Sequence, residues 1–134
     1  MLLVDTNVLV DVFQRDAEWY PWSVGQLRAQ SQVEALAINP IVYAELSLAF
    51  HSPGELDKQL ETIDVQMLEL PRPALFLAGK AFVRYRREGG PRQNVLADFF
   101  IGAHAAVLGC ALLTRDARRY RSYFPTVQLI TPPD

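Results

Sequence analysis

The chain has 134 residues, which suits one compact domain, and half of them are hydrophobic, which excludes a disordered chain. No apolar run approaches the roughly 18 residues that span a bilayer. The first residues also lack the features of a signal peptide, so we expect a cytoplasmic protein. The single cysteine, Cys110, excludes internal disulfides and a cysteine-based metal cluster.

The net charge of -2 hides a division of the chain. Residues 1–71 hold eleven acidic and three basic residues, a net charge of -8, whereas residues 72–134 hold four acidic and ten basic residues, a net charge of +6. This division is typical of an acidic metal site beside a basic groove for a polyanion. An ordinary mixed surface gives the same counts, so charge alone leaves both interpretations open.

The first half of the chain predicts three strands separated by helices. A short apolar strand over Leu2–Asp5 precedes a helix that ends near Gln14, with Asn7 as its expected N-cap. The remaining elements are predicted by apolar periodicity and by proline at helix starts: helices over 20–30, 40–49 and 53–63, and strands over 33–38 and 65–70.

The second half predicts two more strands. A long helix over 73–87 leads into a loop rich in turn-forming residues over 88–94, and a second helix over 97–108 ends at Gly109. A strand over 110–114, a short helix over 117–123 and a strand over 127–130 follow. Alternating strands and helices indicate one α/β domain over residues 1–134, with a mainly parallel sheet covered on both faces.

Four acidic residues are expected at one edge of this sheet. Asp5 ends the first strand and Asp116 follows the fourth, so both lie at the carboxyl edge. Asp98 begins the helix that leads into the fourth strand, and Glu45 lies near the start of the helix that leaves the second strand. Ligands bind at this edge in open α/β sheets. The four carboxylates therefore predict a shared site, with Asp5 and Asp98 as its firmest members.

The donor chemistry favours a hard divalent ion, Mg²⁺ or Mn²⁺, because the four side chains offer only oxygen. Each acid also has a simpler explanation. Asp98 and Asp116 could serve helix starts, Asp5 could end its strand in a turn, and Glu45 could pair with a basic neighbour. Their convergence at one edge favours the shared site over four separate explanations.

The residues around these acids resemble the PIN domain family, specifically the VapC-like toxins of toxin–antitoxin pairs. The resemblance covers essentially the whole chain, in family order, and is carried by Leu3–Asp11, Ile41–Glu45, Leu96–Ala105 and Leu113–Asp116, with Arg119–Tyr120 following. It implies four or five parallel strands, divalent metal, endonucleolytic cleavage of RNA and frequent homodimers. It also implies a cognate antitoxin whose C-terminal segment occupies the groove of the active site.

The resemblance assigns roles to further residues. Asp5 and Asp98 match the principal metal ligands, and Glu45 and Asp116 match acids that bind metal directly or through water. Polar positions that support the cluster correspond to Thr6, Asn7 and Thr114. Asp11 matches a common family acid, but its helical spacing favours a surface charge.

Several basic and aromatic residues are candidates for nucleic-acid or partner contacts. Arg115, Arg118 and Arg119 lie just beyond the proposed site and are expected to contact RNA phosphates, with Arg121 nearby. Arginines 84, 86, 87 and 92 extend this track. Trp19, Tyr20 and Trp22 favour a partner surface slightly over core packing. His104 lies on a different helix face from Asp98, which favours a structural role, and His51 is expected at the surface.

Three other functions fit parts of the sequence. A catalytically inactive RNA- or partner-binding module would tolerate loss of an acid, and all four are present. A phosphatase with a covalent mechanism favours a second aspartate two residues after Asp5, where the chain has Asn7. A metal-dependent DNase uses the same acids and stays the nearest alternative.

Overall fold

The computed structural model describes residues 1–91 and 95–133, so the predicted roles of Arg92 and of the end of the 88–94 loop lie outside the described residues. The chain forms a five-stranded sheet in the order β3-β2-β1-β4-β5, and every neighbouring pair is parallel. The strands are β1 (Leu2–Val4), β2 (Leu36–Ile38), β3 (Val65–Met67), β4 (Ala111–Leu113) and β5 (Leu129–Ile130). The predicted α/β class and parallel sheet are confirmed.

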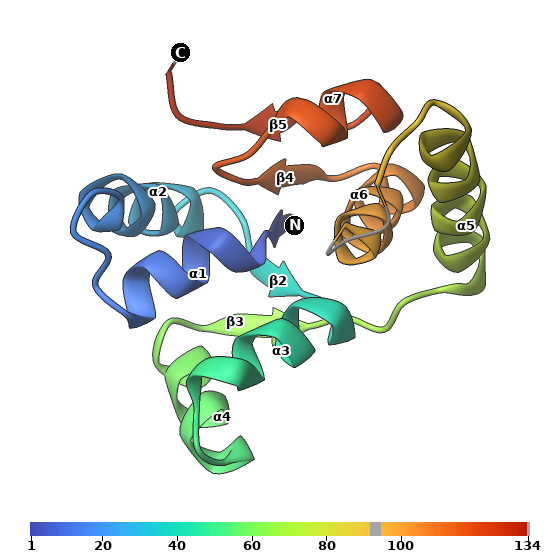
Figure 1. Cartoon of the computed structure of the whole chain (residues 1–134). Coiled ribbons are helices and arrows are strands. Elements are labelled where there is room, and N and C mark those ends of the chain that lie inside the picture. The colour runs from blue at the N-terminus through green and yellow to red at the C-terminus, as the bar shows by residue number, and fades with distance from the viewer. Residues whose placement is uncertain (92–94, 134) are drawn as a thin grey trace.

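The helices lie on both sides of the sheet, as expected (Figure 1). Helices α1 and α2 lie on one side, and α5 and α6 lie on the other. The helical elements are α1 (Thr6–Phe13), α2 (Tyr20–Ser31), α3 (Pro40–Leu46), the short 3-10 helix η1 (Ser47–Ala49), α4 (Pro53–Thr62), α5 (Arg72–Arg87), α6 (Leu96–Leu108) and α7 (Arg118–Tyr123).

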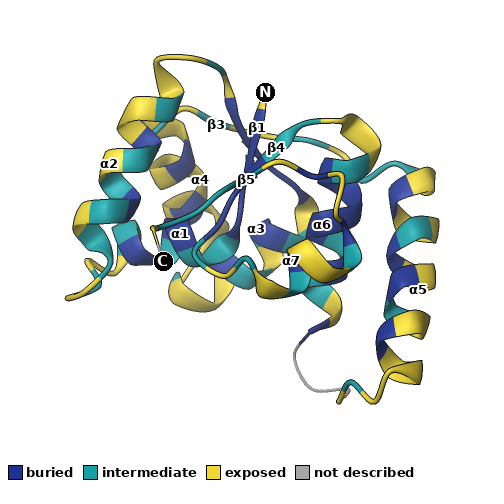
Figure 2. Ribbon diagram, turned by 90° about the horizontal axis from the view of Figure 1, so that it is seen from above, coloured by how far each residue is buried: buried dark blue, intermediate teal, exposed yellow. Residues whose placement is uncertain are grey.

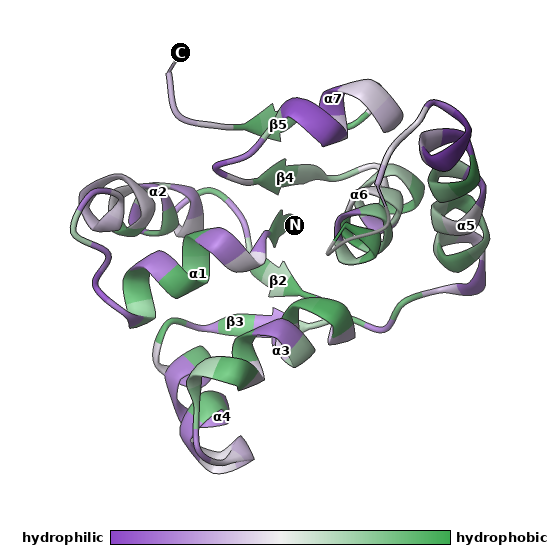
Figure 3. Cartoon of the chain, in the orientation of Figure 1, coloured by the Kyte–Doolittle hydropathy of each residue, from purple (hydrophilic) through white to green (hydrophobic). Residues whose placement is uncertain are grey.

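The core is built from the central strands and the inner faces of the helices, which are buried in Figure 2. All of β1 and the last two residues of β4 are buried, which suits a parallel strand covered on both faces. In Figure 3 these strands and α6 are hydrophobic, whereas the first turn of α7 is hydrophilic. Helix α7 therefore presents a polar surface beside an apolar core.

Several predicted boundaries differ from the structure: the strands predicted over 33–38, 110–114 and 127–130 are shorter, and the helix predicted over 40–49 divides into α3 and η1. Helix α1 begins at Thr6, and Asp5 is its N-cap in place of Asn7, because the Asp5 carboxylate accepts a hydrogen bond from the Thr6 backbone N–H at 2.8 Å. The predicted strand over 65–70 stops at Met67, since this edge strand is only partly buried. Gly109 ends α6 in the left-handed region (φ 67°), as its position predicts.

The order of the strands creates a switch point beside β1. The chain moves from β1 outward through β2 to β3 and then returns to place β4 on the opposite side of β1. The connections that leave β1 and β4 therefore diverge at the carboxyl edge, which is where open α/β sheets bind ligands. Asp5 follows β1, and Thr114 to Asp116 follow β4.

Candidate metal and nucleic-acid site

Asp5 is buried at the switch point and is held by three hydrogen bonds. Its Oδ2 accepts from the Thr114 hydroxyl at 2.7 Å and from the Tyr120 hydroxyl at 2.9 Å, while Oδ1 accepts from the Thr6 backbone. Burial, followed by the nearby Asp98 charge, raises the pKa of Asp5 to about 6, although the three hydrogen bonds oppose this shift. The carboxylate is thus fixed in orientation by neutral donors, and no ion pair within the described residues balances its charge.

Asp98 lies in the first turn of α6 and is half-buried. Arg119 of α7 forms an ion pair with its Oδ2. Burial raises the pKa of Asp98, Arg119 lowers it, and the charges of Glu45 and Asp116 raise it. The charge of Asp98 also raises the pKa of Asp5, so the other three predicted acids all lie within electrostatic range of Asp98. The structure brings the predicted acids to one edge of the sheet.

Glu45 and Asp116 lie at the margins of this group. Glu45 is in the second turn of α3, where its Oε1 accepts from the Thr6 hydroxyl at 2.6 Å. Asp116 is exposed in the connection after β4, and its backbone N–H donates to the Thr114 hydroxyl at 3.1 Å. Helix α7 begins at Arg118 without a side-chain cap, so Asp116 is not an N-cap.

Thr6, Asn7 and Thr114 connect the acids to one another. Besides donating to Asp5, the Thr114 hydroxyl accepts from the Asn7 side-chain amide at 3.4 Å. The Asn7 Oδ1 accepts from the Arg115 backbone N–H at 3.2 Å, which ties α1 to the connection after β4. Thr6 links α1 to Glu45 through its hydroxyl. These predicted supporting residues all contact a predicted acid or the backbone beside one.

Asp11 is not the surface charge that its spacing favoured. It is only 1% exposed, and its carboxylate accepts from Arg115 Nε at 2.6 Å, Arg115 Nη2 at 3.0 Å and the Ser23 hydroxyl at 2.6 Å. Asp11 lies three residues after the buried Val8, on the same face of α1. That spacing was the signal for burial, and the partners came from distant parts of the chain.

Tyr120 is a site residue that the sequence did not single out. Its side chain is buried, and its hydroxyl donates to Asp5. Burial and the charges of Asp5, Asp98 and Glu45 raise the Tyr120 pKa well above its usual range, so the phenol stays protonated and remains a donor. Its place beside Arg119 in the last motif was the available signal.

The arginines near the site divide into two kinds. Arg115 is paired with Asp11, and Arg119 is paired with Asp98. Arg118 and Arg121 are exposed, and within the described residues neither forms an ion pair. The arginines predicted to extend the track, at 84, 86 and 87, do not line the groove described below.

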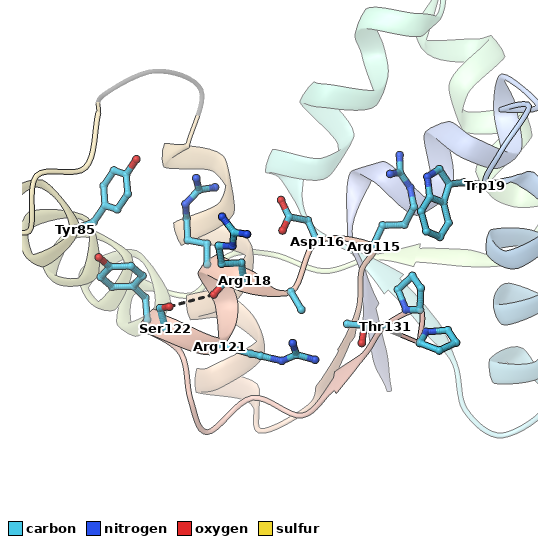
Figure 4. Close-up of a pocket in the computed structure, with 13 residues that line it drawn as sticks. Trp19, Tyr85, Arg115, Asp116, Arg118, Arg121, Ser122 and Thr131 are labelled. Atoms are coloured by element: carbon cyan, nitrogen blue, oxygen red, sulfur yellow. Dashed lines mark hydrogen bonds between the residues drawn. The ribbon is translucent and has the colours of Figure 1, made fainter.

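A groove of about 960 Å³ lies beside Asp116 (Figure 4). Trp19 and Arg115 lie at one end and Tyr85 at the other, with Arg118 and Arg121 between them. The Arg115 guanidinium lies over the Trp19 ring at 5.1 Å from its centroid, and Trp22 packs against Trp19 edge-on at 6.2 Å. Trp19 therefore belongs to the groove wall while remaining partly exposed.

The other singled-out residues have structural partners. His104 is buried, and its Nδ1 accepts from the Asn39 side-chain amide at 3.2 Å, while Asn39 caps α3. Burial lowers the pKa of His104, which keeps the ring neutral and matches the expected structural role. His51 is exposed, as expected, whereas Cys110 is only partly buried and lies just before β4.

The donor chemistry of the acids suits a hard divalent cation, since their side chains offer only carboxylate oxygens and the charge of Asp98 raises the pKa of the buried Asp5. Among the described residues, no three acidic, histidine or cysteine side chains come close enough together to hold one ion. Arg119 instead pairs with Asp98, and Thr6 holds Glu45. The four acids therefore offer the oxygen ligands that a divalent ion prefers, and in this structure Arg119 and Thr6 contact two of them, Asp98 and Glu45.

The chain belongs to the PIN domain family, whose model matches residues 2–124. It is similar over 98% of its length to 98% of a chain in the crystal structure of VapBC2 from Rickettsia felis bound to a DNA fragment from their promoter, with 18% identity and a TM-score of 0.75. No curated protein matches the chain in sequence.

Two further solved structures share this fold. VapBC-1 from nontypeable Haemophilus influenzae matches 97% of this chain and 96% of that chain, with 18% identity and a TM-score of 0.72. A toxin–antitoxin complex from Klebsiella pneumoniae matches 100% of this chain and 99% of that chain, with 18% identity and a TM-score of 0.64. At this identity the likeness shows the fold. No described helix is both long and apolar enough to cross a membrane.

Proposed function

We propose that this chain is a divalent-metal-dependent endoribonuclease and the toxin of a toxin–antitoxin pair. The observation that supports this most strongly is the position of Asp5, Glu45, Asp98 and Asp116 at the carboxyl edge of the sheet, beside the switch point of a PIN domain. Like charges gathered at the carboxyl edge, with one of them fully buried, suit a site that a cation completes.

In this proposal Asp5 and Asp98 hold the principal ion, Mg²⁺ or Mn²⁺, and Glu45 and Asp116 orient water or complete a second site. A bound divalent ion activates water and neutralises charge that develops on the phosphate and the leaving oxygen. The chain's own hydrogen bonds then matter for orientation. Thr114 and Tyr120 hold Asp5 Oδ2, and Thr6 holds Glu45, so these acids keep a fixed direction before substrate arrives.

A cognate antitoxin, homodimers and a cytoplasmic location belong to the same proposal. The structural neighbours include a toxin–antitoxin complex, which supports a cognate partner protein. The basic groove beside Asp116 supports a polyanionic substrate, and Arg115, Arg118 and Arg119, the predicted phosphate contacts, all line it.

The test is cleavage of total RNA by purified protein with Mg²⁺ or with excess EDTA. We expect wild type to cut only with Mg²⁺, and Asp98→Asn to lose roughly 100-fold or more of that activity because a charged ligand is replaced by a neutral amide. Asp64→Asn is the matched control, since Asp64 is exposed and asparagine tolerates its positive φ of 55°.

Each outcome decides between the candidate functions. Equal cutting by Asp98→Asn and wild type, or equal cutting in EDTA, would overturn the site assignment. Cutting of DNA without cutting of RNA would favour the DNase alternative. Tight RNA binding without cutting would favour an inactive binding module. Thermal unfolding of each variant shows whether a lost activity reflects a lost fold.

A further inference from the structure

We infer that Trp19 is the residue on which a base of the bound RNA stacks in the groove beside Asp116, and that Arg118 and Arg121 hold the phosphates of that strand. The inference rests on the proposed function for the choice of RNA. The roles of Trp19, Arg118 and Arg121 follow from the contacts of the groove itself.

The groove arginines differ in whether they already pair with a carboxylate of the protein. Arg115 and Arg119 each face a carboxylate of the protein, Asp11 and Asp98, so their charges are already neutralised. Arg118 and Arg121 line the same groove, are exposed, and have no ion-pair partner within the described part of the chain. These two guanidinium groups are therefore available for the phosphates of a bound strand.

The second observation is that the indole of Trp19 is held in place before any ligand arrives. The Arg115 guanidinium lies over the ring, and the bidentate pair with the buried Asp11 fixes that guanidinium. Trp22 supports the ring edge-on. A large aromatic side chain that is partly exposed and already immobilised binds a flat partner with little further loss of conformational entropy.

The third observation is the arrangement of these groups along one groove. Trp19 lies at one end, with Arg118 and Arg121 between it and Tyr85, and Asp116 lies between Arg115 and Arg118 (Figure 4). Cationic groups interleaved with aromatic rings are the pattern that binds unpaired nucleotides, because phosphates and exposed base faces are both recognised. A duplex stacks its bases internally, so it would use the arginines and leave Trp19 without a partner.

The experiment measures binding without cleavage. In EDTA, anisotropy of a fluorescently labelled RNA of about ten nucleotides is compared with that of the same RNA annealed to its complement. In Trp22→Phe the indole of Trp19 is the remaining tryptophan, so its fluorescence reports directly on stacking. We expect tighter binding of the single strand and quenching of Trp19 by the single strand only.

Variants separate the two kinds of contact. Trp19→Leu should weaken single-strand binding roughly 5- to 150-fold, the range found when one stacked base loses its aromatic partner. Its matched control is Phe76→Leu, because Phe76 is an exposed aromatic residue outside the groove. Arg118→Gln with Arg121→Gln should flatten the slope of log affinity against log salt by about 1.4, since each phosphate contact on a single strand contributes about 0.7. Arg28→Gln with Arg72→Gln, two exposed residues outside the groove, is the control for charge.

Three results would overturn the inference. Equal affinity for the duplex, equal affinity for inorganic polyphosphate, or unchanged Trp19 fluorescence would show that no base stacks in the groove. If groove variants bind as wild type while the protein still cuts RNA, the nuclease proposal survives and the groove assignment fails. If the single strand binds as expected and RNA is not cut, the groove assignment survives and the nuclease proposal fails.

Discussion

The ion pair between Asp11 and Arg115 offers the sharpest test of how the site is held together. The Asp11 side chain is 2% exposed and that of Arg115 is 28% exposed. Replacing Arg115 with Met removes the guanidinium and leaves a buried carboxylate with the Ser23 hydroxyl as its remaining donor. We expect this change to lower the free energy of unfolding by about 3 to 5 kcal/mol, the range for a buried charge that loses its partner.

The reverse change should be milder. In Asp11→Asn the charge left behind is that of the partly exposed Arg115, which water can solvate. We expect a loss of about 1 to 3 kcal/mol. The double variant should lose less than the sum of the two single losses, because the second substitution removes the group that the first left unpaired.

Urea unfolding at neutral pH measures these differences, and thermal melts give a second readout. For a domain of this size, 1 kcal/mol corresponds to about 3 to 5 °C in Tm. Arg28→Met, at an exposed position of α2, should stay within about 0.5 kcal/mol of wild type. An Arg115→Met protein as stable as that control, or single losses that simply add, would refute the argument that Asp11 depends on Arg115.

Three further predictions concern the acids and the packing of α7. The folded pKa of Asp5 is about 6 and its usual value is 3.8, so the folded state binds this proton more tightly than the unfolded chain. The stabilisation is therefore present below pH 3.8 and is lost as pH rises through 6. Wild type should lose about 2 kcal/mol relative to Asp5→Asn between pH 4 and pH 7 in urea titrations, and parallel pH profiles would contradict this. Arg119→Gln should strengthen Mn²⁺ binding roughly 2- to 10-fold in calorimetry, because Arg119 competes for Asp98 in the structure, and weaker binding would count against that competition. Gly102→Ala should destabilise the fold by about 1 to 3 kcal/mol, since the added Cβ would overlap the Phe124 ring and lie 3.0 Å from Tyr120 Cδ1. Gly79→Ala, which has open space around the added Cβ, should be neutral or stabilising in the same denaturation assay.

The parts of the site that depend on strand ends were predictable from sequence. Asp5 and Asp116 follow buried apolar strands, and the alternation with helices makes those strands parallel, so both acids had to lie at one edge. Asp98 was predictable for the same reason, since its helix runs antiparallel to β4. The order of elements follows equally from apolar periodicity and from proline and glycine at helix ends.

The parts that depend on contacts between distant residues were not predictable in this way. Periodicity places Asp11 on a face of α1, but its partner Arg115 lies 104 residues further along. The hydrogen bond from the Tyr120 hydroxyl to Asp5 joins two residues that are 115 positions apart in the sequence. The N-cap of α1 went to Asp5 in place of Asn7 because the Asn7 side chain instead contacts Thr114 and the Arg115 backbone. Hydrogen bonds between distant residues therefore decide which of two locally acceptable residues, Asp5 or Asn7, caps the helix.

The central position of β1 has a consequence for how the protein is made. This strand is the first to be synthesised, yet its neighbour β4 comes from the last quarter of the chain. A nascent chain that ends before β4 contains Asp5 but lacks Thr114, Asp116 and Tyr120, and it leaves one edge of β1 unpaired. The acids therefore converge only after the ribosome has released almost the entire domain. An incomplete copy of this protein carries three of the four acids, Asp5, Glu45 and Asp98, but lacks the two hydroxyl groups, of Thr114 and Tyr120, that hold Asp5.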